Sequence, residues 1–143
     1  MYHYKKIISR LLDQNIYILS NDKQESIIID PGLGFELIDN YLKSQNLKPI
    51  AVLATHAHID HIASANDCIE NYNIPFYICK GNAIMLDHYD IMKGYMNVKS
   101  EKPYVSHWID ESSEKLSIGS FDFKLIYNPC LLYTSDAADE GLG

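Results

Sequence analysis

The segment "LATHAHIDHIA" (residues 53–63) is the most informative stretch of this chain. Three histidines and one aspartate occur within six positions, directly after the run "IAVLAT" at residues 50–55. That run shows no polar alternation, which is typical of a strand buried on both faces of a sheet. Layered α/β proteins place functional residues in the loops that follow such strands. The segment therefore predicts a buried sheet and a site at its edge.

Four side chains of this segment can bind a metal ion: His56, His58, Asp60 and His61. His56 and His58 are two residues apart, so in an extended segment both side chains point the same way. Imidazole nitrogens and carboxylate oxygens suit Zn²⁺, with Fe and Mn as weaker candidates. The alternative is that the histidines lie at the surface and that Asp60 caps the following helix. So dense a cluster after a buried strand favours the metal site.

Five further segments have the composition of strands. β-branched and aromatic residues dominate them, and turn-forming residues separate them. We expect an antiparallel meander of the first three, a short buried strand, and a C-terminal hairpin that turns at Gly119-Ser120. In order, the ranges are 5–10, 15–20, 25–30, 75–80 and 114–129.

Helical spacing of apolar residues predicts three helices. They cover residues 34–46, 62–72 and, as a short helix, 81–88. Residues 90–107 show no clear period and are expected to form a long loop. Strands followed by alternating helices and strands indicate a layered α/β domain.

Composition excludes several classes of function. The chain has 143 residues, 47% of them hydrophobic, and a formal charge of −7, which argues against nucleic acid or an anionic membrane as partner. No apolar run is long enough to span a bilayer, and the N-terminus lacks the features of a signal peptide. The cysteines are odd in number and form no C-x-x-C motif, so we do not expect a disulfide framework. We therefore expect a cytoplasmic location.

The motif "THAHIDH" (residues 55–61) resembles the H-x-H-x-D-H signature of the metallo-β-lactamase-fold hydrolases, and most of all their glyoxalase II-like (hydroxyacylglutathione hydrolase-like) branch. The stretches "IIIDPG" and "LSIGSFDFKLIYNP" support the resemblance, which covers about residues 5–129. The resemblance implies an αββα sandwich, of which this chain would hold the N-terminal half and the start of the second half. That architecture counts as α/β, or as α+β in some schemes.

The same resemblance implies roles for individual residues. His56 and His58 would bind a first metal, and Asp60 and His61 a second, so that an intact site would hold two Zn²⁺ ions. Asp60 would also orient the attacking water and manage its proton, which makes it the expected catalytic residue. Asp30 would support the site from beneath, although a turn-forming Asp before Pro-Gly is an equally good interpretation. Thr55 is expected to serve the backbone at the strand end.

The C-terminal part departs from the family pattern. In the family a further histidine follows the strand that corresponds to residues 123–129, whereas here the match stops at Cys130. The tail "CLLYTSDAADEGLG" (residues 130–143) can be encoded by DNA that resembles a transposase adapter of sequencing libraries. We therefore expect residues 1–129 to be an incomplete domain, residues 130–143 to be a non-native, disordered tail, and the chain by itself to be inactive.

Three functions follow as expectations. The first is metal-dependent hydrolysis of a small ester or thioester, such as a hydroxyacyl-glutathione; the thioester is implied by the resemblance alone. The second is a mononuclear iron persulfide dioxygenase of the same fold. The third is a non-catalytic or structural member. The expected partner is a small-molecule substrate, and the oligomeric state is not readable from the sequence.

Overall fold

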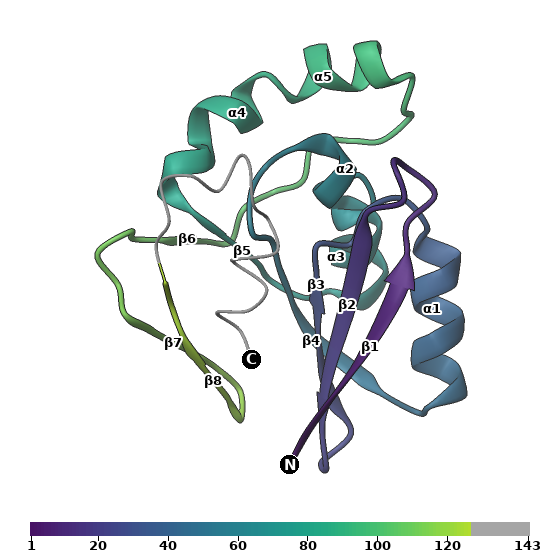
Figure 1. Cartoon of the computed structure of the whole chain (residues 1–143), viewed down its shortest axis with the longest axis vertical. Helices are drawn as coiled ribbons and strands as arrows, with labels where there is room; N and C mark the ends of the chain where they lie inside the picture. The colour runs from purple at the N-terminus through teal and green to yellow at the C-terminus, as the bar shows by residue number, and fades with distance from the viewer. Residues whose placement is uncertain (127–143) are drawn as a thin grey trace.

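The computed structural model describes residues 1–126, so the expected tail at residues 130–143 lies outside the described part. Its centre is a six-stranded sheet with the strand order β1-β2-β3-β4-β5-β6 (Figure 1). A second, two-stranded sheet consists of β7 and β8. Within the described residues, no helix is long and apolar enough to cross a membrane.

The expected antiparallel meander is confirmed. It consists of β1 (Tyr2–Ile8), β2 (Asn15–Asn21) and β3 (Glu25–Ile29), with Ile18 of β2 paired to Ile28 of β3. β3 is followed by Asp30, whose φ of 51° lies in the left-handed region that Asp tolerates better than most residues. The change of backbone direction there lets the next segment leave the sheet.

From β3 onward the strands run parallel. β4 (Lys48–Leu53), β5 (Phe76–Cys79) and β6 (His107–Ile109) follow one another across the sheet, and α1 (Phe35–Ser44) connects β3 to β4. The carboxyl ends of parallel strands meet at the same edge. The residues that follow β3 and β4 are therefore neighbours in space.

The helix expected at residues 62–72 is two helices, α2 (Ile59–Ile62) and α3 (Ala65–Tyr72). Ser64 lies between them and explains the break. Its N–H donates to the carbonyl of Gly32, and its hydroxyl accepts from the N–H of Gly34. Contacts to the turn after β3 thus replace the hydrogen bonds that would continue one helix.

The long loop expected at residues 90–107 is wrong at both ends, because its first residues are helical and its last begins β6, whereas residues 97–106 form neither helix nor strand. The short helical segment expected before it comprises a 3₁₀ turn η1 (Lys80–Asn82) and α4 (Ala83–Asp87), and then α5 runs from Tyr89 to Met96. Tyr89 is fully buried, and Met92 and Met96 pack on the same core at helical spacing. Gly94 and exposed apolar residues between them obscure that period in the sequence. The three-residue strand β6 was also not expected.

The central sheet is covered on both faces because its side chains alternate. Ile28 and Val52 point into a core shared with the helices. Ile27 and Leu53 point into a second core, where they meet Phe121. That residue belongs to the expected hairpin, which is confirmed as β7 (Lys115–Ile118) and β8 (Phe121–Lys124) turning at Gly119. The described residues thus form a helix layer, a sheet and the beginning of a second sheet.

Candidate functional site

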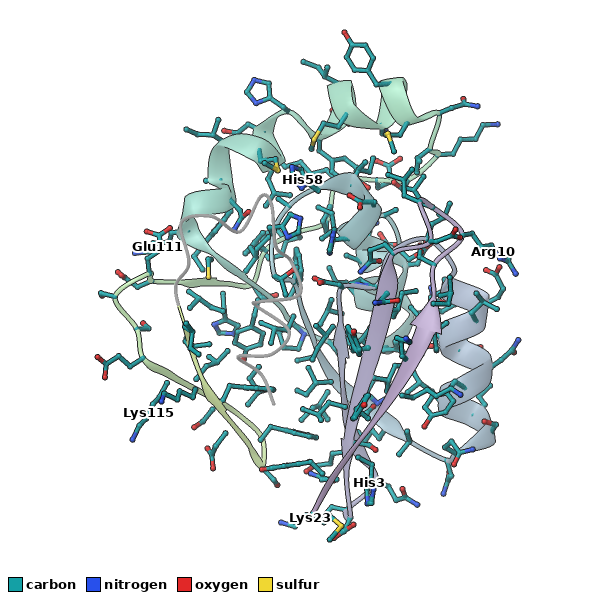
Figure 2. All side chains as sticks on the ribbon, in the orientation of Figure 1. His3, Arg10, Lys23, His58, Glu111 and Lys115 are labelled. Carbon is teal, nitrogen blue, oxygen red and sulfur yellow. The ribbon has the colours of Figure 1, made fainter. Side chains whose placement is uncertain are left out.

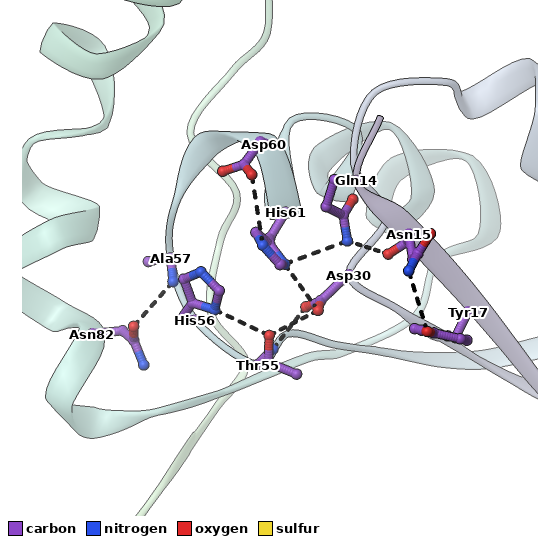
Figure 3. A network of polar contacts seen from close by, with 10 residues as sticks. All are labelled: Gln14, Asn15, Tyr17, Asp30, Thr55, His56, Ala57, Asp60, His61 and Asn82. Atoms are coloured by element: carbon purple, nitrogen blue, oxygen red, sulfur yellow. Dashed lines mark hydrogen bonds and ion pairs between the residues drawn. The ribbon is translucent and has the colours of Figure 1, made fainter. Parts of the chain in front are cut away.

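The four side chains singled out in the sequence lie together at the carboxyl edge of β3 and β4. The ring centroids of His56 and His58 are 4.6 Å apart with the planes nearly perpendicular, and those of His56 and His61 are 4.0 Å apart. The carboxylate of Asp60 lies 3.6 Å from Nε2 of His61 (Figure 3). His56 and His61 are buried, whereas His58 and Asp60 are partly exposed. The cluster therefore has a buried base and an accessible rim.

Local structure explains how one short segment provides these groups. The chain is extended through His58, which precedes the first residue of α2, and it turns into the helix at Ile59. Asp60 lies inside the first turn of α2 and is not its N-cap, so the helix-capping alternative does not describe it. The backbone N–H of His61 donates to the carbonyl of His58, and this bond closes the turn.

Asp30 holds this segment from below. Its side chain is fully buried. Oδ1 accepts the Thr55 N–H at 2.8 Å, and Oδ2 accepts the Thr55 hydroxyl at 2.7 Å. Oδ2 also lies 3.0 Å from Nδ1 of His61. Of the two interpretations of Asp30, the structure favours support of the site, because one carboxylate ties the end of β3 to the segment after β4.

Thr55 extends this network to a second imidazole. Its Oγ1 lies 3.1 Å from Nδ1 of His56. Since the Thr55 hydroxyl hydrogen goes to Asp30, its oxygen accepts from His56, which assigns the N–H of that ring to Nδ1 and the lone pair to Nε2. The Thr55 hydroxyl therefore contacts two side chains, whereas the sequence predicted that it would serve the backbone at the strand end. The carboxylate of Asp30 thus orients His61 directly and His56 through Thr55 (Figure 3).

The site favours neutral imidazoles. Burial and, to a smaller extent, the neighbouring His61 lower the pKa of His56 to about 4. Burial also lowers the pKa of His58. Both rings are therefore neutral near pH 7, which is the form that binds a metal ion.

Sequence reasoning missed two residues that contact the cluster. Gln14, in the turn after β1, places Nε2 at 3.4 Å from Nδ1 of His61. Asn82, in η1, accepts the N–H of Ala57 through Oδ1 at 3.0 Å. Both come from segments far from the histidines in the sequence, and no local pattern points to either.

The remaining histidines lie outside this cluster. His3, His88 and His107 are all exposed. Figure 2 shows His3 at the opposite end of the molecule from His58. Among residues 1–126, no group of three or more His, Cys, Asp or Glu side chains stands in an arrangement that could hold a metal ion by itself.

Comparison with known families gives a match over most of the chain. The model of the metallo-beta-lactamase superfamily matches residues 9–133. The "Probable metallo-hydrolase YqgX" of Bacillus subtilis (strain 168) is 31% identical over 120 residues, which are 82% of this chain and 56% of that protein. The hydroxyacylglutathione hydrolase of Buchnera aphidicola subsp. Schizaphis graminum is 43% identical over 65 residues, 46% of this chain and 26% of that enzyme.

Comparison with solved structures also gives a metallo-beta-lactamase. The B3 metallo-beta-lactamase BLEG-1 superposes with a TM-score of 0.78 at 30% identity, covering 89% of this chain and 62% of that one. TTHA1623, solved in a di-iron-bound form, superposes with a TM-score of 0.74 at 22% identity, covering 87% of this chain and 61% of that one. The chain thus spans a little more than half the length of YqgX and less than two thirds of either solved structure.

Proposed function

This chain belongs to the metallo-beta-lactamase superfamily, and on that premise we propose that the intact protein is a metal-dependent hydrolase of a small ester or thioester. The observation that carries the proposal is the packing of three imidazoles and one carboxylate at the carboxyl edge of β3 and β4. A structural member of the family would have no need of a partly exposed carboxylate beside the buried rings. The accessible rim therefore supports catalysis over a purely structural role.

The described side chains supply part of the ligand set for a divalent cation. The network that starts at Asp30 assigns the N–H of His56 to Nδ1, so Nε2 is the nitrogen that can bind. Burial keeps the same ring neutral. We propose that His56 and His58 hold one ion and that Asp60 and His61 hold a second. Zn²⁺ is the first candidate, and Fe or Mn are the alternatives.

Each residue then has a defined task. Zn²⁺ in such a site acts as a Lewis acid that lowers the pKa of water to about 7 and polarises a carbonyl. Asp60, at the partly exposed rim, orients the attacking water and accepts its proton on a carboxylate oxygen. Asp30 and Thr55 keep the two buried rings from turning. The oxygen of the water bonds to the acyl carbon, the bond from that carbon to the leaving oxygen or sulfur breaks, and the proton held by Asp60 passes to the leaving group, so that the products are a carboxylic acid and an alcohol or thiol.

The proposed substrate class is a small thioester, with a hydroxyacyl-glutathione as its first example. Support comes from the hydroxyacylglutathione hydrolase that is 43% identical over a 65-residue stretch. The formal charge of −7 argues against a polyanion as the partner. A compact acyl compound is therefore a better partner for this site than a nucleic acid.

Turnover by the purified intact protein tests the proposal. We expect hydrolysis of a hydroxyacyl-glutathione that stops on treatment with a chelator and returns with added Zn²⁺. The variant His58→Ala should lose more than roughly 100-fold in kcat/KM, beyond the usual effect of removing a group that only supports a ligand. The matched variant His107→Ala, at an exposed histidine outside the cluster, should keep full activity. Equal activity in both variants would contradict the proposal.

The same preparation separates the hydrolase from the dioxygenase. An iron-loaded protein that consumes oxygen in the presence of a glutathione persulfide, and hydrolyses neither esters nor thioesters, would overturn the hydrolase in favour of the dioxygenase. Hydrolysis without oxygen uptake would exclude the dioxygenase.

A further inference from the structure

Asn82 joins the histidine segment to a distant part of the sheet. Its Oδ1 accepts the N–H of Ala57 at 3.0 Å, and its Nδ2 donates to the carbonyl of Cys79 at 3.2 Å. The reverse orientation of the amide would set its NH₂ group against the Ala57 N–H and its carbonyl against the Cys79 carbonyl. Both ends of the amide are therefore used, and its direction is determined by its two partners.

Ala57 is a sensitive point at which to hold this segment. The residue lies between His56 and His58 and is fully buried. A buried N–H that loses its acceptor also has no water to replace it, so the peptide would move to find another partner. Any rotation of that peptide changes the direction of the two histidines on either side of it.

The other hydrogen bonds described for the cluster do not fix the Ala57 N–H. Thr55 and Asp30 hold the ring of His56 through Nδ1, and Asp30 also holds the ring of His61. These bonds act on the side of the cluster that faces β3. Asn82 comes from η1, directly after β5, and acts on the backbone from the other side (Figure 3).

The segment that carries Asn82 is itself well held. It follows β5 without a linker, and β5 pairs with β6 through Cys79 and Ile109. Lys80, the first residue of η1, lies 3.6 Å from the carboxylate of Asp110, just beyond β6. Asn82 therefore reaches the histidine segment from a part of the sheet whose position is set independently of the site.

We propose that Asn82 is a positioning residue, which holds the Ala57 peptide so that His56 and His58 keep the mutual orientation needed to bind one ion together. This inference deepens the proposed function and rests on its assignment of the two histidines as ligands. Asn82 acts through the backbone and does not itself touch the ion or the substrate. Its removal should weaken metal binding without unfolding the chain.

Three variants of the intact protein test the proposal. Asn82→Leu keeps a similar volume but removes the acceptor, whereas Asn82→Asp keeps an acceptor oxygen for Ala57 and replaces the donor to Cys79 by a second oxygen. The matched control is Asn71→Leu, because Asn71 is exposed on α3 and donates only to a carbonyl of its own helix. Should Asn82→Leu fail to fold, Asn82→Ser replaces it, since its shorter side chain leaves the oxygen out of reach of Ala57.

Two readouts separate positioning from general stability. In the metal-free chain, the Ala57 amide should exchange with solvent at least about 10-fold faster in Asn82→Leu, and near the wild-type rate in Asn82→Asp. In a Co²⁺ titration followed by visible absorption, Asn82→Leu should bind roughly 10-fold to 100-fold more weakly and with shifted bands. Asn82→Asp should lie closer to wild type, and Asn71→Leu should match it in both measurements.

The variant His56→Ala distinguishes the possible failures. If it loses Co²⁺ binding while Asn82→Leu keeps wild-type affinity and bands, the metal site stands and the positioning role of Asn82 is wrong. If His56→Ala binds Co²⁺ as tightly as wild type, the proposed ligands are wrong, and the role of Asn82 is overturned with them.

Discussion

Two histidine–aspartate pairs lie at opposite ends of the central sheet, and their geometry is similar. Nδ1 of His61 is 3.0 Å from Asp30, and Nε2 of His3 is 3.3 Å from Asp22. Their surroundings differ. The side chains of the first pair are 7% and 0% exposed, whereas those of the second are 59% and 68% exposed. Contact distance alone therefore does not distinguish a site from a surface pair.

The difference lies in what else each aspartate binds. Asp22 also pairs with the N-terminal amine, and this hydrogen bond together with that from His3 lowers its pKa. Water can replace both partners at little cost. Asp30 instead binds the N–H and the hydroxyl of Thr55 out of contact with water. Because Asp30 is buried, the loss of any of its hydrogen bonds would destabilise the fold. These bonds therefore hold His56 and His61 in one orientation.

The largest expected effect comes from exchanging each aspartate for its amide. Asn also tolerates the left-handed backbone at position 30. Its NH₂ group, however, cannot accept the hydrogen bonds that Oδ2 of Asp30 accepts from Thr55 and His61. We therefore expect Asp30→Asn to lower the free energy of unfolding by about 3 kcal/mol. Asp22→Asn should have no measurable effect. Urea unfolding of both variants measures this difference, and losses of equal size would contradict the comparison.

A smaller effect is expected from pH in the metal-free chain. The folded-state pKa of His56, about 4 because of burial, lies below the ordinary value of 6.5. The unfolded chain therefore binds more protons between these values, and stability that is complete above pH 6.5 is lost as the pH falls towards 4. We expect this residue to account for on the order of 2 kcal/mol over that range.

Other titratable side chains surround His56, namely His58, His61, Asp30 and Asp60. Its own contribution to the pH dependence of stability is therefore measured as the difference between wild type and a variant that lacks this ring. The variant His56→Gln should flatten the decline in the free energy of unfolding between pH 6.5 and 4. His3→Gln, at the exposed pair, should leave the decline unchanged. Identical curves for His56→Gln and wild type would show that the buried ring does not contribute.

The smallest expected effect concerns Thr55, which has no counterpart at the exposed pair. Thr55→Val keeps the shape of the side chain but removes the hydroxyl that joins Asp30 to His56, and we expect a loss of about 1 kcal/mol in stability. Thr55→Ser should restore most of it. Nitrogen chemical shifts of the His56 ring give the second readout: Thr55→Val should mix its two tautomers, and a ring that stays purely Nδ1-protonated would contradict this role.

The sequence predicted those parts of the fold that depend on local pattern. The meander and the hairpin β7–β8 carry the expected turn residues, and β4 carries the continuous apolar run of a strand buried on both faces. It failed at α5, where Tyr89 and Met92 form a buried stripe between exposed apolar residues, and at β6, a short strand that pairing with β5 defines. Tertiary contacts decide both elements, so their own residues are ambiguous.

The candidate site also has a part that the sequence predicted and a part that it did not. Its four expected ligands stand within one short motif, so spacing alone brought them to notice. For Asp30 the sequence left two interpretations open, and the contacts with Thr55 and His61 favour one. Gln14 and Asn82 could not be predicted, because their contacts exist only once the turn after β1 and the segment after β5 lie beside the histidines.

Metal binding by the intact protein tests the central claim most directly. Calorimetric titration with Zn²⁺ should give an affinity that falls by more than roughly 100-fold in the double variant His56→Ala/His58→Ala, and that is unchanged in His3→Ala. An affinity that survives the double variant, or that depends equally on His3, would contradict the account.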